Sequence, residues 1–222
     1  MASVTLSEFR ERARERADME NSRFISDAEL TRYINSSITE LYDLLIASRG
    51  ENYYVSSYSF TTTGGTDTYA LPSGMLKLLG VDLVRGTNSA YSLKSFKWQE
   101  RNRFREPYFL NDSVNLEYQI RGSNLVFTPV PQGNQDIKLW YIPAAIALVQ
   151  NTDSFDGING WEEYVVIDAA IKMLVKEESD VQELLLAKEQ MRTRILQASS
   201  ARDSNEPPRV VDTAANYYRS WY

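Results

Sequence analysis

Acidic residues at a spacing close to that of a calcium-binding loop are concentrated between Asn151 and Glu163. Aligning Gly157 with the obligatory glycine of an EF-hand loop places Glu163 at the bidentate position. Thr152 and Ser154 then fall where Asp or Asn side chains should coordinate the ion, so the register fails at two ligands. A helix-entry loop built from Asp and Asn turn residues explains the segment better, and we predict no metal site.

The chain contains neither cysteine nor histidine, which excludes a thiol nucleophile, a Ser-His-Asp triad, a Cys/His zinc site and disulfides. It also lacks a glycine-rich phosphate loop and a G-x-S-x-G turn. A glycosidase needs two acids facing each other across a cleft, roughly 5 to 10 Å apart, and the adjacent Glu162 and Glu163 point apart on a helix. We therefore predict a protein that is not an enzyme and binds no cofactor.

A basic and aromatic segment extends from Lys94 to Tyr108, with five cations against Glu100 and Glu106. Interleaved cations and aromatic rings are typical of surfaces that bind phosphates, nucleobases or acidic partners. The alternative is a short amphipathic helix whose Phe96 and Phe104 close a sheet. As a possible protein interface, the segment offers five candidates: Lys97, Trp98, Arg101, Arg103 and Arg105.

The C-terminal residues 203–222 are unusually apolar for a chain end. Pro207 and Pro208 prevent a helix from continuing, so an extended arm is expected. Burying its aromatic rings about offsets the entropy lost on ordering the arm, so firm attachment needs a preformed groove or many arms acting together. The alternative is that the arm folds back on its own domain. The residues predicted to bind a partner are Val210, Val211, Tyr217, Tyr218, Trp221 and Tyr222.

The 222 residues have an ordinary globular composition, with 43% hydrophobic and 24% charged residues. A formal net charge of −6 argues against a dedicated nucleic-acid or membrane-surface protein, because both classes use clustered positive charge. The N-terminus lacks a secretion signal and no stretch is long and apolar enough to span a membrane, so we expect no membrane association.

Helical periodicity predicts four helices. In the first, four arginines alternate with four acids, which indicates a solvated, salt-bridged face. Ser26 and Glu29 form a capping-box pattern at the start of the second. The third and fourth are separated by only a tight turn, so they should form an antiparallel hairpin that packs on the second. The expected ranges are 4–18, 26–50, 159–178 and 179–201.

Alternating Tyr, Thr, Val and Leu residues between 51 and 143 indicate a small antiparallel sheet inserted between the helices. The predicted fold class is α+β and mainly helical: a bundle of long helices with an inserted small antiparallel β-sheet and an extended C-terminal arm. The predicted domains are a single helical domain at 1–202, with the β insertion at about 51–143, and an arm at 203–222.

The order of these features resembles the head-to-tail adaptor proteins of tailed bacteriophages, also called head-completion or connector proteins. The similarity rests on the capped long helix, the segment Leu71 to Val81, the sheet, the segment Trp161 to Ser179 and the final long helix. It covers most of residues 20–222.

The resemblance implies a structural virion protein in the neck between capsid and tail, present in the host cytoplasm during assembly. It implies a homo-oligomeric ring, typically of twelve copies, whose helices form the body beneath the portal protein. The arm would bind the portal, the sheet would face the tail or nozzle protein, and viral DNA would pass through the lumen during ejection without specific binding. The alternative is a soluble binding module or small homo-oligomer with a self-docking arm.

Overall fold

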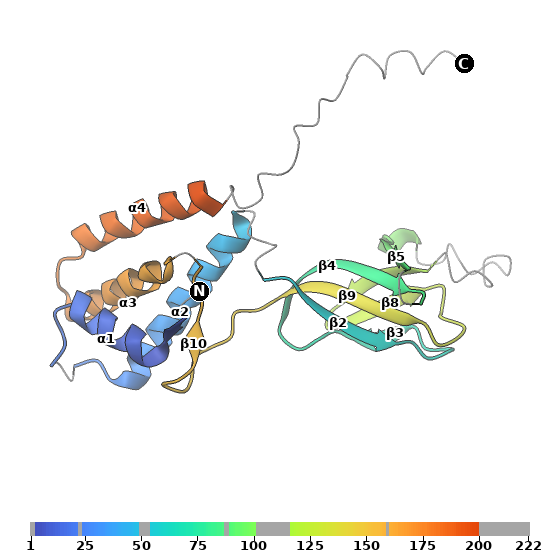
Figure 1. Cartoon of the computed structure of the whole chain (residues 1–222), viewed down its shortest axis with the longest axis horizontal. Coiled ribbons are helices and arrows are strands. Elements are labelled where there is room, and N and C mark those ends of the chain that lie inside the picture. The colour runs from blue at the N-terminus through green and yellow to red at the C-terminus, as the bar shows by residue number, and fades with distance from the viewer. Residues whose placement is uncertain are drawn as a thin grey trace, which may run out of the picture. The chain divides into compact units, whose positions relative to one another are not determined.

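The computed structural model describes residues 3–21, 24–48, 54–86, 89–100, 116–158 and 160–199. These residues form two compact units (Figure 1). The helical unit takes its residues from Met1–Arg49 and Phe155–Tyr222, and the sheet unit takes its residues from Gly50–Ser154.

The helical unit contains the four helices predicted from sequence, each slightly shorter than expected. A short pairing of two strands, β1 (Val4–Thr5) and β10 (Ser154–Phe155), accompanies them. The helices are α1 (Leu6–Arg16), α2 (Asp27–Ala47), α3 (Glu162–Glu177) and α4 (Gln182–Ser199).

Helix α1 begins at a complete capping box that the sequence reading missed: Thr5 and Glu8 each bond the other's backbone or side chain. The predicted solvated, salt-bridged face is present in part: Arg12 and Arg16 are exposed, whereas Arg10 and Arg14 are partly buried. Arg10 donates to the Thr31 hydroxyl, and Arg14 bonds Asp27. Together with the ion pair of Arg16 and Glu163, these contacts tie α1 to its neighbours in the helical unit.

The core of the helical unit is formed by the apolar stripe of α2 against α3. Ser26 caps α2 by accepting a hydrogen bond from the Glu29 N–H, as predicted, while the Glu29 carboxylate instead binds Lys176. Helix α3 contacts all three other helices, and ten of its residues are buried. It is therefore the central element of this unit.

Helix α4 is attached much less deeply than the other helices. Ile195 is its one fully buried residue in the described range, whereas Leu185, Leu186 and Leu196 are 49%, 63% and 41% exposed. The predicted α3–α4 hairpin is confirmed, and the left-handed backbone of Glu178 (φ 63°) ends α3 before the turn. Apolar packing alone holds α4 weakly, so polar contacts matter more for its position.

The sheet unit contains two four-stranded sheets in the orders β2-β9-β4-β5 and β3-β8-β7-β6. All pairings are antiparallel except the parallel pair β6–β7. The strands are β2 (Ser56–Thr61), β3 (Thr68–Ala70), β4 (Met75–Val84), β5 (Ala90–Ser92), β6 (Lys94–Ser95), β7 (Glu117–Arg121), β8 (Asn124–Thr128) and β9 (Asp136–Pro143).

Both sheets contribute to one apolar core, which therefore lies between them. Leu139 on β9 and Phe127 on β8 are at most 1% exposed, and Phe60 and Tyr69 pack against Phe127 with ring centroids 6.4 and 5.8 Å away. The cluster of buried residues is Val81, Leu83, Leu116, Leu125, Phe127, Ile137 and Leu139.

The prediction of a mainly helical bundle with one small inserted sheet is wrong. The structure is 40% helix and 27% strand, with four helices and three multi-strand sheets in the described residues. Helix signals dominated the sequence because caps and 3.6-residue periodicity are easy to recognise. The strands are short, and several are exposed on one side, so their number and their division into two sheets left a weaker pattern.

Candidate functional site

The structure describes only some of the residues predicted to bind partners. The six arm residues, Val210, Val211, Tyr217, Tyr218, Trp221 and Tyr222, lie outside the described residues. Of the basic and aromatic segment, Lys97 and Trp98 are described, whereas Arg101, Arg103 and Arg105 lie outside.

Trp98 lies on the sheet unit, where it is half exposed and begins a short 3₁₀ turn, Trp98–Glu100. The guanidinium of Arg121, at the end of β7, lies 4.4 Å from the centroid of the Trp98 ring. Such a cation–π contact orients both groups while each keeps one side toward solvent. Arg121 therefore extends the basic and aromatic surface, a contribution that the separation of 23 residues in sequence concealed.

Phe96 supports the structural interpretation of the same segment. Its side chain is only 4% exposed, and its N–H donates to the Tyr118 carbonyl at 3.0 Å. Two nearby residues of this segment therefore have different roles. Phe96 anchors the segment to the sheet unit, and Trp98 is half exposed to solvent.

A cavity of about 310 Å³ lies beside this segment in the sheet unit. Its wall mixes apolar side chains with two cations, Arg85 and Lys94, and one carboxylate, Glu117. The lining residues are Leu83, Arg85, Tyr91, Ser92, Leu93, Lys94, Leu116 and Glu117. This set offers hydrogen bonds and charge but no pair of acids or activated nucleophile for a covalent reaction.

The acidic loop before α3 uses its carboxylates to hold its own backbone. Asp153 accepts N–H bonds from Val149 and Gln150, at 2.8 and 2.7 Å, and these bonds lower its pKa. The buried Glu162 accepts the Gly157 N–H at 3.0 Å. Within the described ranges, no group of three or more acidic side chains is placed to hold a metal ion.

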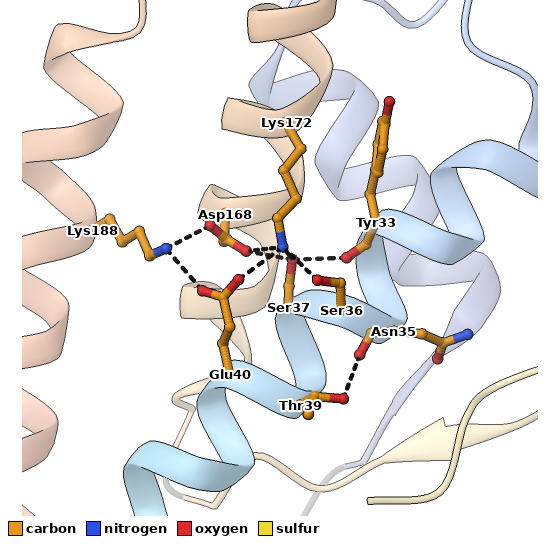
Figure 2. Close-up of polar contacts among 9 residues, drawn as sticks. All are labelled: Tyr33, Asn35, Ser36, Ser37, Thr39, Glu40, Asp168, Lys172 and Lys188. Atoms are coloured by element: carbon orange, nitrogen blue, oxygen red, sulfur yellow. Dashed lines mark hydrogen bonds and ion pairs between the residues drawn. The ribbon is translucent and has the colours of Figure 1, made fainter.

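A polar network joins α2, α3 and α4 around Asp168, which is 3% exposed (Figure 2). The Ser37 hydroxyl donates a hydrogen bond of 2.6 Å to Asp168 Oδ2. Lys188 Nζ donates one of 2.6 Å to Asp168 Oδ1. Lys172 Nζ lies 2.6 Å from Oδ2. Both ammonium groups also bind Glu40, at 3.0 Å, so two lysines and two acids form a neutral cluster.

Electrostatics keep Asp168 and Lys188 in their charged forms. Burial by itself raises the pKa of Asp168, but the bonds from Lys172, Lys188 and Ser37 outweigh it and hold that pKa below its ordinary value. Burial likewise acts to lower the pKa of Lys188, while its bonds to Asp168 and Glu40 raise it well above the ordinary value. The Lys188 ammonium also lies 5.3 Å from the centroid of the Tyr164 ring. A carboxylate held this firmly in its charged form is unsuited to proton transfer.

The network positions helices, and sequence reasoning did not find it. Neither Asp168 nor Lys188 was singled out from the sequence. The available signal was one acid, Asp168, inside the apolar run Val165 to Ile171. Because an unpaired buried carboxylate is costly, such an acid indicates a basic partner elsewhere in the fold.

Comparison with known proteins identifies the family of this chain. Residues 4–212 match the family model described as SU10 adaptor protein. That match places the protein in the class of bacteriophage adaptor proteins, as the resemblance predicted. The chain belongs to the SU10 adaptor protein family. No protein of curated function matches it.

None of the helices in the described ranges has the length and apolarity to cross a membrane.

Proposed function

We propose that this chain is a non-enzymatic structural protein of the virion that joins the capsid to the tail. The observation that carries the proposal is the adaptor family match over residues 4–212, which includes both units and the first half of the arm. The polar groups described in the helical unit serve packing, which fits a role in assembly.

In the proposed assembly, twelve copies form a ring under the portal protein and leave a channel through which viral DNA passes without specific binding. The net charge of −6 supports passage, because phosphate capture needs clustered cations. The protein is located in the virion neck, after a period in the host cytoplasm during assembly.

Each part of the chain has a separate role in this proposal. Residues 1–202 form the ring body, with the β insertion at about 51–143 directed at the tail or nozzle protein. Residues 203–222 form the arm that binds the portal, through the six apolar side chains named above. Lys97 and Trp98, with Arg101, Arg103 and Arg105, contribute to contacts with the tail or with a neighbouring copy. The pair of Trp98 and Arg121 supports this assignment, because it presents a preformed surface.

One observation favours an alternative, a soluble binding module or small homo-oligomer whose arm docks on itself. Helix α4 ends at Ser199, just before the arm, and exposes Leu185, Leu186 and Leu196. Exposed leucines are a surface that apolar arm residues such as Val210 and Val211 would cover in this alternative.

Imaging of the native virus particle tests the proposal. We expect a ring of this chain between the portal and the tail, with the residues after 202 in contact with the portal. A particle in which the chain lies elsewhere, or in which the arm covers α4 of its own copy, would overturn the proposal.

A further inference from the structure

The sheet β2-β9-β4-β5 ends in two different edge strands, β2 and β5. Within the described residues, β2 pairs with β9 alone and β5 with β4 alone, so each has an outer edge without a paired strand. Edge strands offer rows of backbone donors and acceptors to other chains, and natural proteins commonly protect them with Lys, Pro or β-bulges.

Strand β2 has none of these protections. Its sequence from Ser56 to Thr61 is Ser-Ser-Tyr-Ser-Phe-Thr, without charge or proline, and its register with β9 runs without a shift. Thr62 N–H donates to the Gln135 carbonyl, which continues this ladder by one residue. Because bonding alternates along an antiparallel pair, the backbone groups of the odd-numbered residues point away from β9. These are the exposed residues Ser57, Ser59 and Thr61.

Strand β5 likewise has no second partner strand among the described residues. Arg85 N–H donates to Ser89, and Leu93 N–H donates to Val81, so the odd-numbered residues of β5 face β4. The backbone groups of Ala90 and Ser92 therefore point outward. All three residues of β5 are exposed and uncharged. The nearby Arg85 guanidinium lies 5.5 Å from the centroid of the Tyr91 ring, and β2 carries no cation that would repel it.

Each edge also carries one exposed aromatic ring, Tyr58 on β2 and Tyr91 on β5, and the two rings lie on the same face of the sheet. Tyr58 pairs with Leu139 and Tyr91 with Leu83, and both leucines belong to the core. Residues directly opposite in a ladder share a face, so both tyrosines lie on the core side. Their exposed fractions are 42% and 51%. A strand added at either edge would cover one ring, and joining the two edges would cover both.

Strand direction decides how two copies can join. The strands alternate through four antiparallel positions, so β2 and β5 run in opposite directions. Neighbouring copies in a ring of twelve differ by a rotation of only about 30°, so their strand directions nearly agree and β5 of one copy lies antiparallel to β2 of the next. The β2 edge and the β5 edge are different surfaces. A contact that joins two different surfaces of identical copies generates a ring when the rotation closes.

We infer that the sheet units of neighbouring copies join edge to edge, with β2 of one copy paired to β5 of the next. This inference rests on the proposed ring and names one of its subunit contacts. Backbone hydrogen bonds supply the affinity, as in other cases of strand addition, and the paired Tyr58 and Tyr91 rings supply cross-strand packing.

Cysteine cross-linking tests this contact sharply, because the natural chain has no cysteine. Two double variants, Ser59→Cys with Ala90→Cys and Ser59→Cys with Ser92→Cys, cover the two registers nearest the centre of β2. Cross-strand Cβ separations of about 4.5 to 5.5 Å approach those that a disulfide needs. Particles carrying each variant are oxidised and separated on a denaturing, non-reducing gel. The control is Thr68→Cys with Ala90→Cys, because Thr68 lies on β3, an edge of the other sheet.

We expect a ladder of covalent oligomers from at least one test pair and monomers from the control. Particles that contain the ring but give no ladder, or an equal ladder from the control, would overturn the edge contact and leave the proposed ring intact. Dimers from Ser59→Cys alone would show β2 pairing with β2, and a cross-link from it to a tail protein would show a foreign strand. Either result also overturns the contact. Absence of any ring from particles would instead overturn the proposed function.

A backbone variant covers the case in which the cysteine variants fail to assemble. Ser59→Pro removes an N–H that points away from β9, so the existing ladder is kept. We expect a folded chain that enters particles at least tenfold less than Ser59→Ala. Equal incorporation of a folded Ser59→Pro chain would overturn the contact.

Discussion

Lys188 on α4 and Asp168 on α3 are joined by a 2.6 Å ion pair inside the helical unit. Helix α4 buries little apolar surface, so this contact fixes its position more than packing does. The lysine reaches past the surface to a carboxylate that is itself bonded to Ser37 on α2 and to Lys172. The three helices are therefore coupled through one buried side chain.

Asp168→Ala should destabilise the helical unit strongly. It leaves Lys172 and Lys188 without their buried partner, and breaking a buried ion pair typically costs about 3–5 kcal/mol. The exposed pair of Arg192 and Glu189 provides a matched control, because a surface pair contributes about 0–1 kcal/mol. Denaturant unfolding of Asp168→Ala and Arg192→Ala measures both. Equal unfolding free energies for the two variants would contradict the role assigned to the network.

Acid should weaken the same network. The folded-state pKa of Asp168 is lowered, so its contribution is present above the ordinary value of 3.8 and is lost as the pH falls through the lowered value. Stability should therefore decline between about pH 4 and the acid limit of the titration, and Asp168→Asn should flatten part of that decline. Thermal unfolding of both proteins across this pH range measures the difference. Parallel curves would show that Asp168 contributes nothing to the acid dependence.

Gly157→Ala should be destabilising by roughly 1–3 kcal/mol through overpacking. A Cβ at this position would lie 2.8 Å from the Glu162 N and 2.9 Å from its Cγ, so the turn into α3 must shift. Gly133→Ala is the control, because its Cβ would meet no atom within 4 Å. The denaturant concentration at the unfolding midpoint measures the stability of each variant. A Gly157→Ala midpoint equal to that of Gly133→Ala would disprove the crowding.

Trp98→Ala should reduce attachment of the tail by about tenfold while leaving portal attachment unchanged. The ring and the Arg121 guanidinium form one exposed, oriented surface, and aromatic and arginine side chains often dominate interface energies. The neighbouring Gln99→Ala serves as the control. Counting tailed particles produced with each variant measures the effect, and equal counts would remove Trp98 from the tail interface.

The sequence allowed the helices to be predicted because their signals are local. Ser26 caps α2, and apolar residues such as Leu30 and Ile34 repeat at helical spacing and are fully buried. The two-sheet architecture depends on long-range pairings such as that of β2 with β9, which alternation alone does not specify. The number and layout of the strands were therefore predicted poorly.

The candidate site shows the same division. Trp98 stood out by composition, but its partner Arg121 lies on another strand, and only the fold brings the two together. Asp168 and Lys188 are 20 residues apart, and the hairpin of α3 and α4 makes them neighbours. Residue types could be flagged from the sequence, whereas the pairings that give them a role required the fold.

The central claim is that the arm attaches this adaptor to the portal, and binding of purified portal rings to the chain tests it most directly. The full chain is compared with a chain ending at residue 202, with Trp221→Ala/Tyr222→Ala, and with Arg12→Ala as an exposed control. We predict folded proteins throughout, no portal binding after truncation, binding weakened at least tenfold in the double variant, and normal binding for Arg12→Ala. Full portal binding by the chain ending at residue 202 would contradict the claim.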